Sequence, residues 1–309
     1  MALFGFILKR SAQSLVAIIG LLVLVFFLSR LTGDPAYLYL PLDSSEAQRQ
    51  AFSDANGFND PIYIQFGRYL AGVSNLDFGV ALSRNRPAME VALEAFPQTL
   101  KLALIAMALS LVLAIIVGSL AAAKPDSLFD RLATAGSLVG ASAPDFWVAI
   151  VAILVFSVGL GLLPTSGTGT PLHWLMPIFV LMLRPFGLLV QVVRGTMISA
   201  LSSPYVKTAR AKGVRRSHII FRHALRNSLL PVITVAGDLA ASLVNGAVVV
   251  ESIFGWPGIG KLMIDAIVRR DFALIQATVL ITAIAIFVLN ILIDLVYARL
   301  DPRIRFQAR

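Results

Sequence analysis

The residues from Gly255 to Leu262 come close to a phosphate-binding loop. They read Gly-Trp-Pro-Gly-Ile-Gly-Lys-Leu, whereas a loop that cradles nucleotide phosphates needs Gly-x-x-x-x-Gly-Lys followed by Ser or Thr. The missing hydroxyl is the group that holds Mg²⁺, and Leu262 cannot replace it. A strand should also precede such a loop, but a long apolar run precedes this one. A nucleotide site is therefore rejected.

The same segment is better interpreted as a tight turn on the outer side of a membrane. Proline and glycine break regular structure, so the preceding apolar run should end here. We expect a short re-entrant or interfacial helix to follow over Ile259–Val268. The residues assigned to this external gate or turn are Glu251, Pro257, Gly258 and Gly260.

Two charged residues, Arg184 and Asp238, stand inside apolar runs, where an unpaired charge costs at least about 2.5–3.5 kcal/mol. At 1.5 Å per helical residue both lie roughly 15–16 Å from the nearer end of their run. They could form an intramembrane ion pair, line a translocation path for a charged solute, or occupy unrelated sites. Asn245, beside Gly246, could pack between helices or contact the same solute.

The sequence does not indicate a metal site or a catalytic site. The chain has no cysteine, which excludes disulfides, iron–sulfur clusters and thiolate zinc sites. Its three histidines, His173, His218 and His223, are far apart relative to the apolar runs. We predict no metal site, no catalytic cluster and no resident cofactor.

The composition indicates an all-α integral membrane protein. Hydrophobic residues make up 58% of the 309 residues and charged residues 14%, against about 25% charged in soluble domains. The mean hydropathy is +0.83. About 20 apolar helical residues cross a bilayer, and six segments are long enough. The predicted spans are Ser11–Leu31, Leu100–Ala123, Ala135–Leu163, Trp174–Thr196, Ser228–Val250 and Leu274–Tyr297.

Basic residues set the orientation. The net charge is +9, and most lysines and arginines fall in loops on one face if the N-terminus is cytoplasmic. The link 164–173 has none, as expected outside. Both termini are thus predicted inside (N-in, C-in). The exceptions, partly offset by nearby acids, are Arg68, Arg84, Arg86, Lys261, Arg269 and Arg270.

The spans divide the chain into four parts. Residues 1–31 hold the N-terminal segment and first helix, and 32–98 form an external segment in which we expect an amphipathic helix over Ile62–Val73. Residues 99–300 form a five-helix core that contains a cytoplasmic segment, 202–227. A cytoplasmic tail, 301–309, follows.

The cytoplasmic segment 202–227 has the end signals of a helix. Pro204 suits a first helical turn and Gly213 a C-terminal turn. The small Ala209 and Ala211 would allow another protein to approach closely. Arg210 and Lys212 could bond its acidic groups or carbonyls. Charge alone would equally fit an ordinary basic loop.

The complete pattern resembles the coupling signature of ABC importer permeases, in the form found in dipeptide and oligopeptide permeases. Lys207 and Thr208 stand where Glu-Ala is usual, which favours the peptide subfamily. Further ordered matches, such as Asp77-Phe78-Gly79 and Arg194, make nearly the whole chain similar to the first (B-type) permease of a pair. The residues that carry the signature are Tyr205, Ala209, Arg210, Ala211, Lys212, Gly213, His223, Asn227 and Pro231.

The resemblance implies a type I ABC importer permease in the bacterial inner membrane. Its expected partners are membrane lipid, a second, C-type permease, two ATPases that bind ATP and Mg²⁺, and an external solute-binding protein, but no nucleic acid. The segment around Gly213 would dock on an ATPase. The cargo would be a peptide, although nickel chelates, glutathione, opines or oligosaccharides remain alternatives. A non-ABC secondary transporter explains the spans but not the signature.

Overall fold

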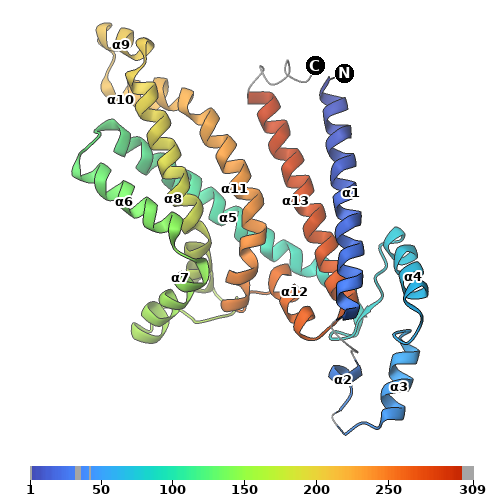
Figure 1. Cartoon of the computed structure of the whole chain (residues 1–309). Coiled ribbons are helices and arrows are strands. Elements are labelled where there is room, and N and C mark those ends of the chain that lie inside the picture. Colours follow the sequence, from blue (N-terminus) through green and yellow to red (C-terminus); the bar gives the residue numbers. More distant parts are fainter. Residues whose placement is uncertain (1, 32–35, 42, 301–309) are drawn as a thin grey trace. The chain divides into compact units, whose positions relative to one another are not determined.

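The computed structural model describes residues 2–31, 36–41 and 43–300. Two compact units divide this chain. The first comprises Leu3–Thr99 and Pro257–Phe287, and the second comprises Leu100–Trp256 with residues from Val288 onward. Both are helical (Figure 1). In the described ranges a two-stranded antiparallel ribbon, β1 (Val80–Ala81) with β2 (Arg86–Pro87), is the sheet structure.

Five helices are long and apolar enough to cross a membrane, and a bent pair can supply a sixth span. Satisfying backbone hydrogen bonds locally is what allows helices to reside in lipid. The prediction of an all-helical membrane protein is confirmed. The five single helices are α1 (Ala2–Leu31), α5 (Ala88–Ala123), α8 (Leu172–Ser202), α11 (Leu225–Ile253, preceded without a break by α10 and η2) and α13 (Phe272–Leu300).

The predicted third span is not one continuous helix. It consists of α6 (Leu128–Ser142) and α7 (Asp145–Ala152) with the π-helix η1 (Ile153–Gly159), bent by 105° at the break. Ala143 and Pro144, in extended conformation, separate the two helices. Proline disfavours helical conformation in the residue before it, which accounts for the break.

The second span also differs from its prediction, because α5 begins at Ala88 rather than near Leu100. Pro97 lies inside this helix. Residues 88–98, assigned to the external segment, are therefore helical and continuous with the span. The rest of that segment holds α2 (Ala36–Tyr39), α3 (Glu46–Ala55) and α4 (Ile62–Ser74). Helix α4 confirms the helix predicted over Ile62–Val73.

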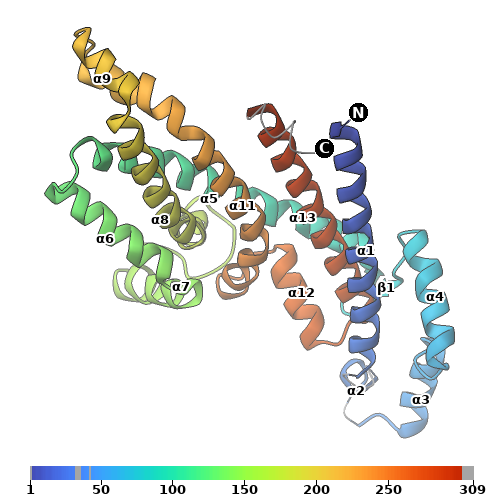
Figure 2. The same ribbon diagram turned by 45° about the horizontal axis from the view of Figure 1, so that its top comes forward.

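The first unit packs α1 beside α13 and α4 (Figure 2). Phe26 of α1 stacks on Tyr69 of α4 at 5.0 Å between ring centroids. The Tyr69 hydroxyl donates to the Leu22 carbonyl at 3.3 Å. Aromatic pairs of this kind contribute beyond their buried area. They fix the amphipathic helix α4 to the first span.

Two side chains bridge distant parts of the first unit. The Thr99 hydroxyl accepts a hydrogen bond from the Ile259 backbone N–H at 2.8 Å, capping α12 (Ile259–Val268). The fully buried Asp271 carboxylate accepts from both the backbone N–H and the hydroxyl of Ser83, at 2.9 and 2.7 Å. Buried polar groups need such partners.

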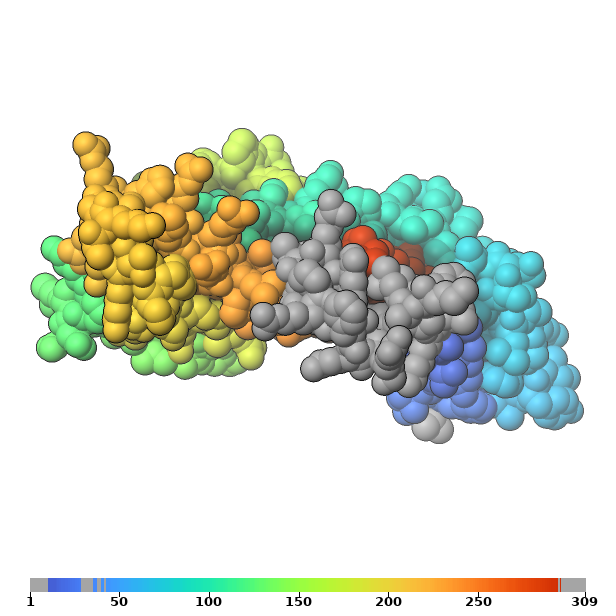
Figure 3. Space-filling model, turned by 90° about the horizontal axis from the view of Figure 1, so that it is seen from above, coloured from blue at the N-terminus to red at the C-terminus, as the bar shows by residue number. Residues whose placement is uncertain are grey.

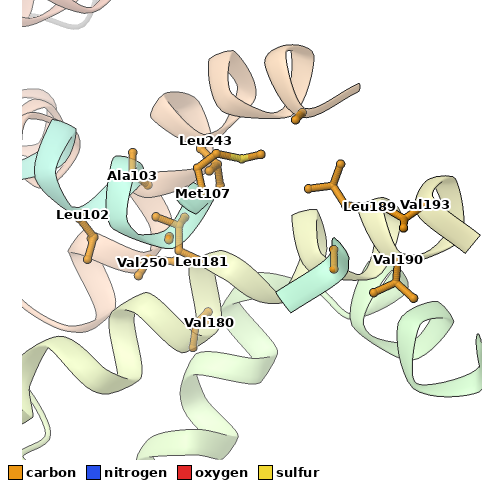
Figure 4. Close-up of a cluster of buried hydrophobic side chains, with 14 of the residues drawn as sticks. Leu102, Ala103, Met107, Val180, Leu181, Leu189, Val190, Val193, Leu243 and Val250 are labelled. Carbon is orange, nitrogen blue, oxygen red and sulfur yellow. The ribbon is translucent and has the colours of Figure 1, made fainter. Parts of the chain in front are cut away.

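The second unit is built on α8, which packs against α6 and α11. Its apolar core comes from α5, α8 and α11, with Leu102, Met107, Leu181, Leu189 and Leu243 among the buried side chains (Figure 4). Glycine allows close helix contact in membranes. A Cβ on Gly187 of α8 would lie 2.3 Å from the Ser137 carbonyl oxygen of α6, so these helices touch backbone to backbone.

Candidate functional site

Helix α11 carries a polar stripe along its exposed side. The opposite side packs in the core through residues such as Val232, Leu243 and Ala247. From Thr234 to Asn245 exposed polar residues recur every three or four positions, and Ser252 follows seven positions later, which places all of them on one helix face. We call this the α11 stripe. Its members are Thr234, Asp238, Ser242, Asn245 and Ser252.

The hydroxyls of the α11 stripe donate within their own helix. Thr234, Ser242 and Ser252 bond the carbonyls of Leu230, Leu239 and Val248 at 3.0, 2.8 and 2.8 Å. A hydroxyl that donates once keeps its oxygen lone pairs as acceptors. The stripe therefore combines satisfied donors with acceptor oxygens and one carboxylate. Such a face suits water or a hydrogen-bonding solute better than lipid.

Helix α8 has polar or small residues at the same kind of spacing. Arg184, Gly195 and Ser199 are exposed, and Gln191 is half-buried. Because α8 packs directly on α11, two neighbouring helices of one unit carry polar residues at membrane depth. A polar face on a spanning helix belongs against a water-filled cavity or another protein.

The structure does not support a direct ion pair between Arg184 and Asp238. Both side chains are exposed, and the ion pairs of the described chain do not join them. The charge of Arg184 acts on the carboxylate of Asp145, the first residue of α7. Sequence reasoning missed Asp145, although Pro144 before it signals an interruption. In the described part of the isolated chain the two residues thus do not pair directly, and a role in a path stays a prediction for both residues and for Asn245.

The external turn forms where it was predicted, between α11 and α12. Gly255 adopts a positive φ of 61°, a conformation that glycine tolerates without strain. The Trp256 N–H donates to the Glu251 carbonyl at 2.8 Å, and the Trp256 ring meets Trp174 edge-on at 4.5 Å. Glu251 itself is fully buried. Its role in an external gate or turn stays a prediction.

The remaining residues of the turn open α12 in the first unit. Gly258 is the N-cap residue, and Gly260 lies buried in the first turn. Helix α12 spans Ile259–Val268, which confirms the bounds predicted from Pro257 and the glycines. A phosphate loop requires a strand directly before it, and no strand precedes the Gly255–Leu262 segment.

The predicted cytoplasmic helix exists as α9 (Pro204–Ala211), with Pro204 in the first turn. Gly213 has a φ of 72°. The Gly213 N–H donates to the Arg210 carbonyl and the Val214 N–H to the Ala209 carbonyl, at 3.0 and 3.2 Å. This pair of bonds is the Schellman ending, which needs a left-handed residue at the position that Gly213 occupies.

The outer surface of α9 is exposed. In α9 itself the buried side chain is Val206, and the helix packs against η2 (Ile219–Ala224). Figure 3 shows the yellow and orange residues of this region standing at the surface. Tyr205 and the end of the helix face outward. The exposed residues there are Tyr205, Arg210, Ala211, Lys212 and Gly213, with Ala209 half-buried.

The base of this segment is tied to the spanning helices. Arg216 of α10 (Arg216–His218) donates through Nη2 to the Ala123 carbonyl, the last residue of α5, at 2.5 Å. A cation at a helix C-terminus is favourable. His223 lies in the π-helix η2 with its ring 5.4 Å from that of His218, so these two histidines are neighbours, and the statement that all three histidines are far apart was wrong for them. Asn227 is exposed in the first turn of α11.

A buried ion pair joins α6 to α8 near the same end. Asp130 binds Arg194 through Nε–Oδ1 and through Nη2–Oδ2, the second at 2.7 Å. The Asp130 side chain is 2% exposed. Sequence reasoning singled out Arg194 but not its partner, since the two are 64 positions apart. In the described part of the chain no group of His, Asp or Glu could hold a metal ion.

Together, the spanning helices with polar faces and the exposed basic helix define a multi-pass membrane permease. The comparisons with known proteins agree. Residues 114–306 match the family described as "Binding-protein-dependent transport system inner membrane component". The chain belongs to this family and is a permease of the bacterial inner membrane.

Full-length relatives place it further within the family. The chain is 37% identical to the oligopeptide transport system permease protein AppB of Bacillus subtilis, over 98% of this chain and 99% of the relative. It is 35% identical to the dipeptide transport system permease protein DppB of Escherichia coli K12, over 97% and 98%. It therefore resembles peptide-type permeases of the B type from end to end.

One solved structure shows the same fold at low identity. A crystal structure of an amino acid ABC transporter with histidines aligns with a TM-score of 0.55 and 14% identity. The alignment covers 68% of this chain and 94% of that one. At this identity the likeness concerns the fold alone.

Proposed function

We propose that this permease forms half of the translocation path of an ATP-driven importer of peptides or peptide-like solutes. The observation that carries the proposal is the exposed, Schellman-capped α9 at one end of a unit whose helices α8 and α11 carry polar residues at membrane depth. Relatives named for oligopeptide and dipeptide transport support a peptide cargo. The chain itself would hydrolyse no ATP.

Helix α9 would be the contact with a cytoplasmic ATPase. Its polar and small residues face outward, while Val206 anchors it and Arg216 ties the following turn to α5. A rigid, protruding helix of this kind can enter a groove on a partner and transmit displacement. Two ATPases would bind ATP with Mg²⁺, so this chain needs no cofactor of its own.

The path itself would run along the α11 stripe and the polar side of α8. Lipid cannot satisfy Asp238, Asn245 or Arg184, so a second, homologous permease should face them. When the ATPases close on ATP, movement of α9 would reach the ends of α5 and α11. The two permeases would then open outward and accept cargo from an external solute-binding protein.

The test is reconstitution of the complete complex in proteoliposomes. This permease is co-expressed with its genomic neighbours that encode a second permease, ATPases and a solute-binding protein, and uptake of radiolabelled di- and oligopeptides is measured. We expect uptake to require ATP on the side of the membrane that carries the ATPases. Uptake should stop in a complex whose ATPases lack the phosphate-loop lysine. Peptide uptake that survives this variant and collapses with a proton ionophore would indicate a secondary transporter instead.

Cargo class is tested in the same vesicles. Peptides are expected to compete with the labelled peptide, while nickel chelates, opines and oligosaccharides are not. ATP-driven uptake of one of these solutes without peptide uptake would retain the importer and overturn the peptide cargo.

A further inference from the structure

Asp145 is a carboxylate placed at the break of a membrane span. It is the first residue of α7, directly after the extended Ala143 and Pro144, where α6 and α7 meet at 105°. Its side chain is half-buried. Among the described residues, the carboxylate oxygens of Asp145 accept no hydrogen bond and form no ion pair within 4.0 Å. A charge within a candidate membrane span and without a bonded partner is costly, and a function is the usual reason to retain it.

The surroundings of Asp145 hold it beside the proposed path. A Cβ on Gly246 of α11 would lie 3.9 Å from Asp145 Oδ2, so the carboxylate reaches the α11 helix at the residue next to Asn245 of the stripe. Glycine leaves this approach open because it has no side chain there. Asp145 thus meets α11 at the edge of the polar stripe.

Arg184 supplies the opposite charge. It attracts Asp145, yet the two do not form one of the direct ion pairs of the described chain. Arg184 is exposed, and Asp145 is half-buried. Two opposite charges that act on each other without a direct bond can each bind one end of a ligand that carries both signs. A peptide with free ends carries an ammonium and a carboxylate.

We propose that Asp145 binds the α-ammonium group of a peptide in transit, at the level of the α6–α7 break, while Arg184 binds its carboxylate. This rests on the proposed peptide-import function and assigns its charge recognition to residues of this chain. A charge-assisted bond between carboxylate and ammonium replaces the water that the peptide loses on entering the path. Asn245, the neighbour of Gly246 on α11, offers a neutral amide for the peptide backbone.

The first experiment compares peptides with and without a free amino group. The reconstituted importer carrying Asp145→Asn is tested with a free dipeptide and with its N-acetylated form, each rate divided by the wild-type rate for the same peptide. This division cancels the preference of the solute-binding protein. Loss of a hydrogen bond to a charged group lowers binding by about tenfold or more. We expect that fall for the free peptide and little change for the acetylated one.

Arg184→Gln gives the mirror image. The uptake rate of this variant, relative to the wild type, should fall about tenfold or more for a peptide with a free C-terminal carboxylate and little for the same peptide with a C-terminal amide. Equal losses for all peptides in both variants, with recovery in the charge-swapped Asp145→Arg/Arg184→Asp protein, would overturn the proposal and show a structural pair. Wild-type vesicles that import no peptide at all would overturn the proposed function itself, which keeps the two failures distinct.

A second experiment does not depend on which peptides are imported. The chain has no cysteine, so Asp145→Cys introduces a single thiol into it, and the partner subunits are used in cysteine-free form. We expect a water-soluble thiol reagent to label this thiol in the assembled complex. A free dipeptide, added at a concentration raised more than tenfold to offset the lost carboxylate, should slow the labelling at least severalfold. Absence of labelling, or labelling that peptide does not change, would overturn the proposal.

Gly246 provides a matched steric test. Gly246→Ala places a methyl group at ordinary contact distance, 3.9 Å from Asp145 Oδ2, and should keep peptide uptake. Gly246→Leu should cover the carboxylate and lower uptake of the free dipeptide about tenfold, as Asp145→Asn does, while the subunits still co-purify. Full uptake by a correctly assembled Gly246→Leu complex would contradict the site.

Discussion

Asp130 and Arg194 join the start of α6 to the cytoplasmic half of α8 through two parallel hydrogen bonds, one of them 2.7 Å long. The carboxylate is almost fully buried and also accepts from the Asp126 N–H at 2.8 Å. Arg194 is 28% exposed. This two-point geometry is specific to the planar guanidinium group. It fixes where the broken third span begins relative to the helix that carries Arg184.

Removing the charge of Asp130 should destabilise the permease. Asp130→Asn keeps the shape of the side chain but leaves Arg194 with a weaker, single acceptor, at a cost of about 1–3 kcal/mol. We expect a lower Tm of the purified complex. Arg194→Lys should behave similarly, because an ammonium group cannot form both bonds. Unchanged Tm in both variants would mean that the pair contributes only specificity.

The matched control is the Arg86–Glu94 pair, whose side chains are 44% and 58% exposed. Solvent screens such surface pairs. Arg86→Gln should therefore leave the Tm of the complex close to that of the wild type.

The contact between α6 and α8 should be intolerant of a single methyl group. In Gly187→Ala the new Cβ would lie 2.3 Å from the Ser137 carbonyl oxygen and 2.7 Å from the Ala141 nitrogen. Both are backbone atoms, so the helices must separate, at about 1–3 kcal/mol. We expect reduced yield of assembled complex and a lower Tm. Gly195→Ala, in the same helix with nothing within 4 Å, is the control and should match or exceed wild-type stability.

The α11 stripe should be accessible to water in the assembled transporter. Single cysteines at Ser242 and Asn245 are expected to react with a charged, water-soluble thiol reagent, because the thiolate forms only where water is present. A cysteine at the buried Leu243 should not react. Neither should one at Val112, which is 54% exposed on the apolar α5 and is expected to face lipid. Equal reactivity at Asn245 and Val112 would remove the basis for a path along α11.

Local signals in the sequence predicted the helix ends well. Pro204 and Gly213 bound α9 because a first-turn proline and a left-handed glycine act within a few residues. Pro257 and the glycines around it predicted the bounds of α12 for the same reason. The Arg210–Gly213 surface follows from these ends, since a short helix between two chain reversals has little to pack against.

Contacts between distant residues could not be predicted from one sequence. The apolar run from Ala135 to Leu163 reads as one span because hydropathy does not register a bend. Pro144 was the available sign of the break. Asp145 is the first residue after that bend, so its place beside α11 could not be read from the sequence, in which an Arg184–Asp238 pair was one of three alternatives. Pro97 had the opposite effect: it suggested that the helix starts after it, but α5 continues through it.

Arg216 should influence coupling more than assembly. Its bond to the Ala123 carbonyl, at 2.5 Å, ties the end of the α9–α10 segment to α5. In Arg216→Gln the α9 surface is unchanged, so the ATPases should still co-purify. Movement of α9 would then reach α5 less directly, and peptide transported per ATP hydrolysed should fall severalfold. Arg215→Gln changes the charge of an exposed neighbour and should keep the wild-type ratio; a fall of equal size would point to charge alone.

Gly213 offers the sharpest test of α9, because its φ of 72° penalises any residue with a Cβ. Gly213→Val should cost at least about 1–2 kcal/mol at this position and unwind the last turn of α9. Gly213→Asn should cost less, since asparagine tolerates this conformation. If α9 must keep its ending to dock, ATPase co-purification and peptide uptake should fall strongly for Val and only modestly for Asn. The side chains are similar in size, so the difference isolates the backbone. Equal losses for both variants would indicate that the Cβ itself collides with the ATPase, and equal retention would show that the Schellman ending is dispensable for coupling.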